Sequence, residues 1–430
     1  MFKLFKKILD KFLAHLAKKI IKKYQPRIIG ITGSVGKTST KEAIFEILKD
    51  KFNARQSIKN YNTEIGVPLT IIGANSAGKN IFGWFKIWLQ ALNLIWGFNE
   101  NYPEILILEM AADHPEDIKH LIKIAPCNIA VITAVSETHL EFFKSVKAVK
   151  QEKQILVSHL APESVAILNY DDDLVMDMQD KTRAKILTFG FLDGADLRAF
   201  DFSYQVDKDN KFSHLNFKIN YLEETLEVDL LNALSKSHVY SFLGAIMVGL
   251  VYKIDLKILI NKLKNFKPPK GRMNFITGIK HTKIIDDTYN SSPRAAVSAL
   301  ETLAKLYTTG KKIAVLGDML ELGQFTEKAH YDLGEKVCHL GIDILVIVGE
   351  RVRDIAEGAK NAGMNSEKIF SFAKTELAGK FVQDKIEKGD IILVKASQGM
   401  RFEKIVKEIM AEPLKAKELL VRQEQEWLRQ

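Results

Sequence analysis

The chain has 430 residues, 47% of them hydrophobic and 27% charged, which is ordinary for a globular protein of two or three domains. Cys127 and Cys338 lie far apart without a C-x-x-C pair, which excludes a disulfide framework or a zinc ribbon and favours a reducing, cytoplasmic setting. The formal net charge is +9, but residues 1–24 carry eight Lys and one Asp, so the rest has an excess of only about +2. An excess this small and diffuse argues against nucleic-acid binding.

The first 24 residues predict a basic amphipathic helix. Lysines interrupt its apolar residues throughout and no small-residue cleavage site follows, so it is not a secretory signal. Two interpretations stay open: the helix lies on an anionic membrane surface, or it packs on its own domain with a solvated lysine face. The apolar residues, spaced three or four apart, are Phe2, Phe5, Leu9, Phe12, Leu16 and Ile20.

Residues 81–98, "IFGWFKIWLQALNLIWGF", hold three of the four tryptophans. Lys86, Gln90, Asn93 and Gly97 form a narrow polar stripe along this otherwise apolar segment. We therefore expect a buried or interfacial helix and not a membrane span. Our hypothesis is that residues 1–24 and 81–98 together form a surface that contacts the inner membrane face or a partner protein.

From residue 27 onward, short apolar runs alternate with helical patterns. The runs at 27–33, 104–111, 128–135 and 164–170 are rich in β-branched residues, as is typical of a parallel sheet covered on both faces. Between residues 195 and 231 the apolar residues alternate strictly with polar ones, which predicts antiparallel strands appended to that sheet. The sequence thus predicts an α/β domain of the mononucleotide-binding type.

A second α/β domain is expected after "NFKPPKGRMN" (265–274), whose two prolines and glycine indicate a boundary. We predict a basic helix over 1–24, a P-loop domain over 25–267 and a Rossmann-like domain over 268–430. The second domain should contain strands within "TKIIDDTYN", "KKIAVLGDM", "DILVIVGE" and "GDIILVKAS", helices over 295–306, 326–340, 351–362 and 401–410, and a further helix in the tail from residue 413.

The stretch "GITGSVGKTSTKE" (30–42) is close to a phosphate-binding loop, although the pattern G-x-x-x-x-G-K-[ST] requires a glycine where this chain has Ile31. A strand, a glycine loop and a helix starting near Ser39 offer backbone N–H groups to phosphate oxygens, with the Lys37 amine for their charge and the Thr38 hydroxyl for Mg²⁺. The residues expected to bind phosphate are Gly33, Ser34, Val35, Gly36, Lys37, Thr38 and Ser39.

Two other nucleotide chemistries fit poorly. The only candidate for the guanine motif N-K-x-D, "NKLK" at 261–264, ends in a base, and "TGSVGK" does not supply G-x-G-x-x-G. Glu109 and His139 instead follow predicted strands, so both can converge with Thr38 at the carboxyl edge of the sheet and hold a Mg²⁺ that bridges ATP phosphates. Taken alone, each residue is better explained as a cap or a surface residue, and only the ordered set favours the metal site.

Seven segments occur in the order found in Mur ligases, and the sequence resembles this family over roughly residues 26–410. In that family the displaced loop glycine is normal. "NTEIGVPLT" and "VLGDMLELG" are similar to the branch that adds D-Ala-D-Ala. The segments are "GITGSVGKTSTKE", "NYNTEIGVPLT", "LEMAADHPEDI", "ITAVSETHLEFFKS", "DDTYNSSP", "VLGDMLELG" and "ILVKAS".

The resemblance implies an ATP-dependent amide-bond ligase of peptidoglycan precursor synthesis, with ATP and Mg²⁺, a UDP-muramoyl-tripeptide and D-Ala-D-Ala as cofactors and substrates. The γ-phosphate passes to a peptide carboxylate, and an amine attacks the resulting acyl phosphate. By similarity, Lys37 neutralises phosphate, whereas Thr38, Glu109 and His139 serve two Mg²⁺ sites. Lys153 aligns with the family lysine that is carbamylated to become a metal ligand. Lys37, Glu109, His139 and Lys153 are the catalytic residues that the resemblance implies.

The second domain contributes the remaining candidates. Arg272 and Asp287 match family residues that hold the phosphates and ribose of ATP. Substrate-binding residues implied by the resemblance, in segments that face the acceptor and the amine, are Asn62, Tyr289, Asn290, Asp318, Glu321, Lys395 and Ser397.

The sequence also departs from the family pattern. Ser292 replaces an Asn, and "KASQ" (395–398) replaces "KGSR". The adenine-side motif G-x-H-N-x-x-N reads "SKSHVYS", with Ser237, His238 and Ser241 at its three polar positions, so we expect base recognition to differ. A UDP-sugar-binding domain usually comes first in this branch, where this chain has a lysine-rich helix. Two alternatives therefore stay open: a ligase of the same chemistry with another acceptor or amino acid, and a non-catalytic membrane-surface scaffold.

Overall fold

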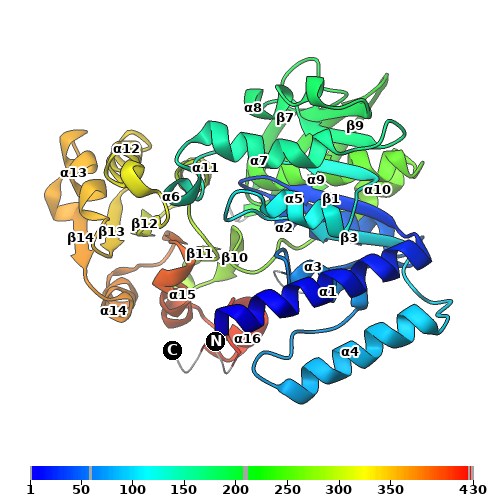
Figure 1. Ribbon diagram of the computed structural model, residues 1–430. Helices are drawn as coiled ribbons and strands as arrows, with labels where there is room; N and C mark the ends of the chain where they lie inside the picture. Colours follow the sequence, from blue (N-terminus) through cyan, green and yellow to red (C-terminus); the bar gives the residue numbers. More distant parts are fainter. Residues whose placement is uncertain (1, 58–60, 207–211, 425–426, 428–430) are drawn as a thin grey trace.

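Figure 1 shows the computed structural model, which describes residues 2–57, 61–206, 212–424 and 427. Two sheets lie side by side, each with helices packed against it. The first has nine strands in the order β2-β3-β1-β4-β5-β6-β7-β8-β9. They are β1 (Arg27–Thr32), β2 (Ala54–Gln56), β3 (Ile105–Glu109), β4 (Ile129–Ile132), β5 (Val165–Asn169), β6 (Lys185–Gly190), β7 (Leu197–Val206), β8 (Phe212–Tyr221) and β9 (Glu224–Leu230).

Helices cover both faces of this sheet. On β1, Ile28 belongs to one hydrophobic core, whereas Ile29 and Ile31 belong to the core on the other face, as the two-residue period of a strand requires. The pairings from β2 to β7 are parallel and those of β7-β8-β9 are antiparallel, which confirms the predicted fold class. The helices are α1 (Phe2–Tyr24), α2 (Lys37–Leu48), α3 (Gly66–Ile72), α4 (Ile81–Trp96), α5 (Asp117–Ile124), α6 (Leu140–Phe143), α7 (Val146–Ser158), α8 (Asp173–Met176), α9 (Lys236–Val251) and α10 (Leu256–Leu263).

The second sheet has six strands in the order β10-β11-β15-β12-β13-β14, of which only β10 runs antiparallel to its neighbour. Its strands are β10 (Asn274–Thr277), β11 (Lys283–Asp287), β12 (Lys312–Gly317), β13 (Ile344–Val348), β14 (Ile369–Phe372) and β15 (Ile391–Lys395). Its helices are α11 (Pro293–Lys305), α12 (Thr326–His339), α13 (Arg353–Asn361), α14 (Thr375–Lys385), α15 (Glu403–Ile409) and α16 (Ala416–Leu419).

The N-terminal helix α1 packs on the first sheet's own layer of helices. Leu13, Leu16, Ala17 and Ile20 are buried in the same core as α3, α4 and α5. Phe12, which the sequence period places on the apolar face, is instead 42% exposed. The side chains of Phe2 and Phe5 lie outside the described residues. The buried face of α1 therefore packs on the protein's own domain, while contact of its lysine face with a membrane stays a prediction.

Helix α4 lies at the outer edge, below α1 in the view of Figure 1. It contacts the core through Ile87, Ala91 and Leu94. From the predicted polar stripe, the amide of Gln90 donates to the carbonyls of Ile72 and Gly73 at the end of α3. Across the described residues, we find no helix with the length and apolar character needed to cross a membrane.

The further helix predicted in the C-terminal tail is found, but it is much shorter than the tail. A 3₁₀ turn (Pro413–Lys415) leads into the single turn of α16, and the backbone at Leu420 is extended. Leu420 is buried, and Arg422 adopts φ 56° while its guanidinium binds backbone carbonyls of the strand-β11 loop. Tertiary contacts thus override the helical pattern of this segment.

Candidate active site

The glycine loop connects β1 to α2, which begins at Lys37, two residues earlier than predicted. Gly33 has φ 150°, and a Cβ there would lie 1.9 Å from the Thr133 hydroxyl. Gly36 has φ 89° and precedes α2 without any side-chain cap. Both positions therefore require glycine, and the first N–H groups of α2 are left for an anion.

The predicted residues Thr38, Glu109 and Asn62 meet at the carboxyl edge of the sheet. The Thr38 hydroxyl donates to Glu109 Oε2 at 3.0 Å, and Asn62 Nδ2 donates to Glu109 Oε1 at 3.2 Å. Glu109 is only 2% exposed. Within the described ranges no three His, Cys, Asp or Glu side chains converge as a metal site. One carboxylate with a hydroxyl and an amide suits Mg²⁺, which keeps several ligands from water and substrate phosphates.

Two buried lysines lie near this cluster. Burial lowers the pKa of Lys37, although the negative charge of Glu109 partly offsets this. Burial, together with the positive charge of Lys37, lowers the pKa of Lys153 from 10.5 to about 7. The negative charge of Asp113, a residue absent from the predicted site, raises the pKa of both lysines. The loop is therefore a concentrated positive site that an anionic ligand would stabilise.

Arg272, which precedes the first strand of the second sheet, contacts the residue after the phosphate-loop lysine. Its Nη2 donates to Thr38 Oγ1 at 3.3 Å, and its guanidinium lies 4.0 Å from the ring centre of Tyr289. The buried Nε of Arg272 has no hydrogen-bond partner among the described residues. An unpaired, buried guanidinium N–H beside a phosphate loop is suited to a phosphate oxygen.

Two other predicted residues, Asp287 and Lys395, are buried close to Arg272, and the exposed Asn290 contributes its carbonyl. Lys395 Nζ lies 2.6 Å from Asp287 Oδ2 and donates to the Asn290 carbonyl at 2.9 Å. The other oxygen of Asp287 accepts the backbone N–H of Met273. Because Asp287 is held on both sides, its carboxylate has a fixed position at the wall of the cavity described below.

His139 contacts the second domain. Its Nδ1 lies 2.6 Å from Glu321 Oε2, and its Nε2 lies 3.4 Å from Asp113 Oδ1. The hydrogen bond with His139 lowers the pKa of Glu321. A second interdomain ion pair, which we did not predict, joins Arg294 to Asp172 at 2.6 Å. Asp113 lies within "LEMAADHPEDI", and Arg294 directly follows "DDTYNSSP". Their position in or beside segments that carry the family resemblance is the sequence feature that could have identified them as site residues.

Asp318 and Ser397 brace loops in this structure. Asp318 Oδ1 accepts the N–H groups of Arg351 and Val352 just before α13. The Ser397 hydroxyl accepts the N–H of Leu320 and donates to the Ser291 carbonyl. Their assignment to the acceptor side stays a prediction.

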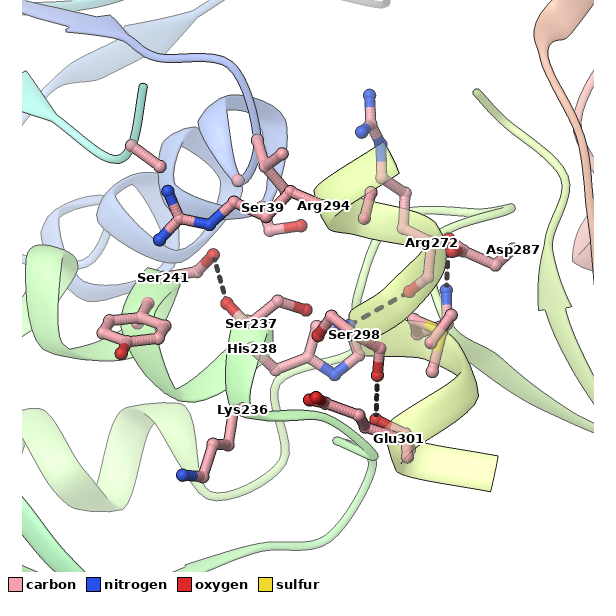
Figure 2. A pocket seen from close by; sticks show the side chains of 18 of the residues that line it. Ser39, Lys236, Ser237, His238, Ser241, Arg272, Asp287, Arg294, Ser298 and Glu301 are labelled. Carbon is pink, nitrogen blue, oxygen red and sulfur yellow. Dashed lines mark hydrogen bonds between the residues drawn. The ribbon is translucent and has the colours of Figure 1, made fainter. Parts of the chain in front are cut away.

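A cavity of about 470 Å³ opens between the loop and the second domain, which is a suitable size for a nucleotide. Figure 2 shows Ser39 and Ser241 on one side of it, Arg272 and Asp287 on another, and Ser298 and Glu301 from α11. Arg272, Asp287 and Lys395 line the cavity together with Gly36, so the predicted phosphate and ribose residues surround a single space.

His238, at the position where the family motif has an amide, is buried and uses both ring nitrogens internally. Its Nδ1 accepts the Leu234 N–H, and its Nε2 bonds the Arg272 carbonyl, as Figure 2 shows for the latter. The ring therefore ties the start of α9 to the segment that carries Arg272. Because both ring nitrogens are used internally, the expectation that base recognition differs from the usual motif stays a prediction.

Burial lowers the pKa of His238 to about 4 from an ordinary value of 6.5. Below pH 6.5 the unfolded chain binds a proton at this residue, whereas the folded chain does so only near pH 4, so stability is lost as the pH falls. We expect the stability difference between the wild type and His238→Asn to shrink by about 2 kcal/mol between pH 7 and pH 5. Urea unfolding of both proteins at the two pH values measures it, and parallel profiles would contradict the assignment.

Both halves of the chain match known families. Residues 31–82 and 90–249 match the Mur ligase middle domain, and residues 271–398 match the "Mur ligase, glutamate ligase domain". The UDP-N-acetylmuramoyl-tripeptide–D-alanyl-D-alanine ligase of Synechocystis is 30% identical over 400 residues, covering 93% of this chain and 78% of that protein. This chain belongs to the Mur ligase family.

Other Mur ligases also match this chain over most of its length. The enzyme of the same name from Bacillus subtilis is 29% identical over 402 residues, covering 94% of this chain and 80% of that protein. The crystal structure of the MurF ligase from Thermotoga maritima in complex with ADP superposes with a TM-score of 0.76 at 27% identity, covering 95% of this chain and 84% of that one. A MurF structure from Acinetobacter baumannii, with a TM-score of 0.77 at 24% identity over 92% of this chain and 79% of that one, shares the fold.

Proposed function

We propose that this Mur ligase is an ATP-dependent ligase that joins D-Ala-D-Ala to UDP-N-acetylmuramoyl-tripeptide in peptidoglycan precursor synthesis. The observation that carries the proposal is the contact of Arg272 with Thr38, because it brings two domains together at one phosphate site. The names of the Synechocystis and Bacillus subtilis relatives, and the ADP complex of the Thermotoga protein, support this choice of substrates.

The reaction needs charge neutralisation and positioning more than covalent catalysis. A carboxylate oxygen of the acceptor attacks the γ-phosphorus of ATP and ADP leaves, giving an acyl phosphate. The amine of D-Ala-D-Ala then attacks the acyl carbon, loses a proton, and phosphate leaves. Lys37 and Arg272 would neutralise the negative charge that moves during the first step, and the burial of the Lys37 amine and of the Arg272 Nε strengthens the effect of these charges.

Thr38, Asn62 and Glu109 are the residues that would hold Mg²⁺, which supplies additional positive charge to the phosphates when bound. His139 and Lys153 are proposed for the second site. A neutral amine is required for carbamylation, and the burial of Lys153, which lowers its pKa to about 7, makes that form accessible at neutral pH. Their roles rest on the family resemblance together with this environment.

Phosphate release by the purified protein tests the proposal. We expect ATP, Mg²⁺, UDP-N-acetylmuramoyl-tripeptide and D-Ala-D-Ala together to give phosphate and a product heavier by the dipeptide in mass spectrometry. Omitting any one substrate is the control. Turnover only with another nucleotide peptide or another amine would favour a ligase with a different acceptor, and no turnover with any pair would favour the scaffold.

A further inference from the structure

Helix α4 is apolar on the face that points away from the protein. Four side chains spaced by three, four and seven residues are 81%, 53%, 46% and 78% exposed: Phe82, Phe85, Leu89 and Trp96, called here the α4 stripe. Ile81 and Phe98 beside it are also exposed. Among the described residues, six of seventeen exposed large hydrophobic side chains lie between residues 81 and 98. A cluster of this kind is unusual on a soluble surface and indicates an interaction site.

This exposure does not come from a helix that is loosely attached. The opposite face of α4 is buried through Ile87, Ala91 and Leu94. Lys23 and Tyr24, at the end of α1, donate to the Leu94 carbonyl at 3.0 Å each, so the C-terminal ends of the two helices are joined. Figure 1 shows α1 and α4 along the same outer edge. The buried face of α4 and its hydrogen bonds to α1 therefore hold the α4 stripe in place.

The positive charge of the protein is concentrated in the same two segments. Residues 1–24 carry eight Lys and one Asp, and residues 65–99 carry two Lys, Lys79 and Lys86, and no acidic residue. The chain has 62 basic and 53 acidic residues in all, so everything outside these segments holds 52 of each and is neutral. The whole net charge of +9 thus belongs to the regions that contain α1 and α4.

Four lysines of α1 whose side chains the structure describes face solvent. Lys11, Lys18, Lys19 and Lys22 are exposed, while the buried positions between them anchor the helix. Phe12 is exposed among them. Lysines next to exposed aromatic and aliphatic side chains are the pattern by which a helix enters the headgroup region of a bilayer that carries anionic lipids.

We propose that α1 and α4 form a docking surface for an anionic lipid bilayer, with the α4 stripe inserted between headgroups and the lysines of α1 in contact with lipid phosphates. The occupant follows from charge and shape together. An apolar protein groove would cover the stripe but would not account for a net charge confined to these two segments, whereas an anionic bilayer uses both. This inference is independent of the substrates assigned to the active site.

Vesicle co-sedimentation of the full chain tests the proposal. We expect the protein to sediment with vesicles in which roughly a third of the lipid is phosphatidylglycerol, to remain in the supernatant with pure phosphatidylcholine, and to be released as salt is raised. Trp96 fluorescence should shift to shorter wavelength only with the anionic vesicles. No sedimentation with anionic vesicles at low salt would overturn the proposal.

Matched variants separate the two parts of the surface. Phe82→Gln with Trp96→Gln should weaken binding to anionic vesicles about tenfold or more, whereas Leu222→Gln with Leu414→Gln, equally exposed elsewhere, should not. Lys18→Gln with Lys22→Gln should also weaken binding to anionic vesicles. Lys360→Gln with Lys388→Gln removes two exposed lysines elsewhere and should not weaken it. Because none of these residues lines the cavity, phosphate release in solution should be unchanged in all four variants.

Self-association is the competing outcome. If the wild type is a dimer by light scattering, and Phe82→Gln with Trp96→Gln makes it a monomer while vesicle binding is unaffected by that variant, the stripe is a protein interface and the proposal is wrong. A monomeric wild type that loses vesicle binding in the same variant supports it. If the wild type releases no phosphate, the proposed enzymatic function is wrong. The vesicle-binding result still decides the membrane proposal, because it does not depend on activity.

Discussion

Lys37→Ala is expected to lower the turnover of ATP about a thousandfold or more, which is the scale found when a charge that stabilises a transition state is removed from a buried site. The Lys37 amine lies at the start of α2 and donates to the Gly33 carbonyl at 2.7 Å, inside the loop it would serve. The measurement is phosphate release at saturating ATP, acceptor and D-Ala-D-Ala, with kcat and KM determined separately.

The same substitution should leave the fold intact. Burial lowers the pKa of Lys37, which means that the protein disfavours the charged form of this amine and gains little stability from it. Lys49→Ala, at the exposed end of the same helix, is the matched control and should keep full activity. A Lys37→Ala protein that folds and turns over within tenfold of wild type would contradict the assignment of the loop.

The sequence was sufficient to predict four of the parallel strands, the antiparallel strands and the loop because these depend on local patterns, whereas β2 and β6 were not predicted. The β-branched runs of β1, β3, β4 and β5 are each flanked by helices, so parallel strands buried on both faces are the direct consequence. The Gly33–Gly36 spacing is likewise local, since each glycine is required by its own φ. The position of Glu109 at a strand end likewise predicted that it converges with Thr38, 71 residues away, at the carboxyl edge of the sheet.

Contacts between distant segments could not be predicted from pattern. Arg272 and Thr38 are 234 residues apart, and no periodicity relates them. Arg294 is one arginine near the start of a helix, and its pairing with Asp172 depends on how the domains meet. His238 reads as an eroded motif, and only the structure shows that its ring bonds the Arg272 carbonyl. These residues depend on tertiary geometry, which a single sequence does not specify.

The contacts of the C-terminal tail also depend on tertiary geometry, and they predict a large effect of substituting Arg422. The Glu403 carboxylate, 1% exposed in its side chain, is shared by Arg401 at 2.6 Å and Arg422 at 2.9 Å. Arg422 also donates to the Thr288 and Tyr289 carbonyls, and its guanidinium lies 5.7 Å from the Tyr289 ring centre. The tail thus reaches the active site through Tyr289, which also packs on Arg272.

Arg422→Leu is expected to lower the free energy of unfolding by about 3 kcal/mol, because it leaves the buried Glu403 carboxylate with one partner in place of two. It should also raise the KM for ATP, because Tyr289 loses the contact that holds it against Arg272. Urea unfolding and phosphate release at varied ATP measure the two effects. Arg401→Leu is the matched control, since it removes the other partner of Glu403 but makes no contact with Tyr289 among the interactions described. Both variants should be destabilised, whereas only Arg422→Leu should change the KM; an equal change in both would show that Arg422 acts on stability alone.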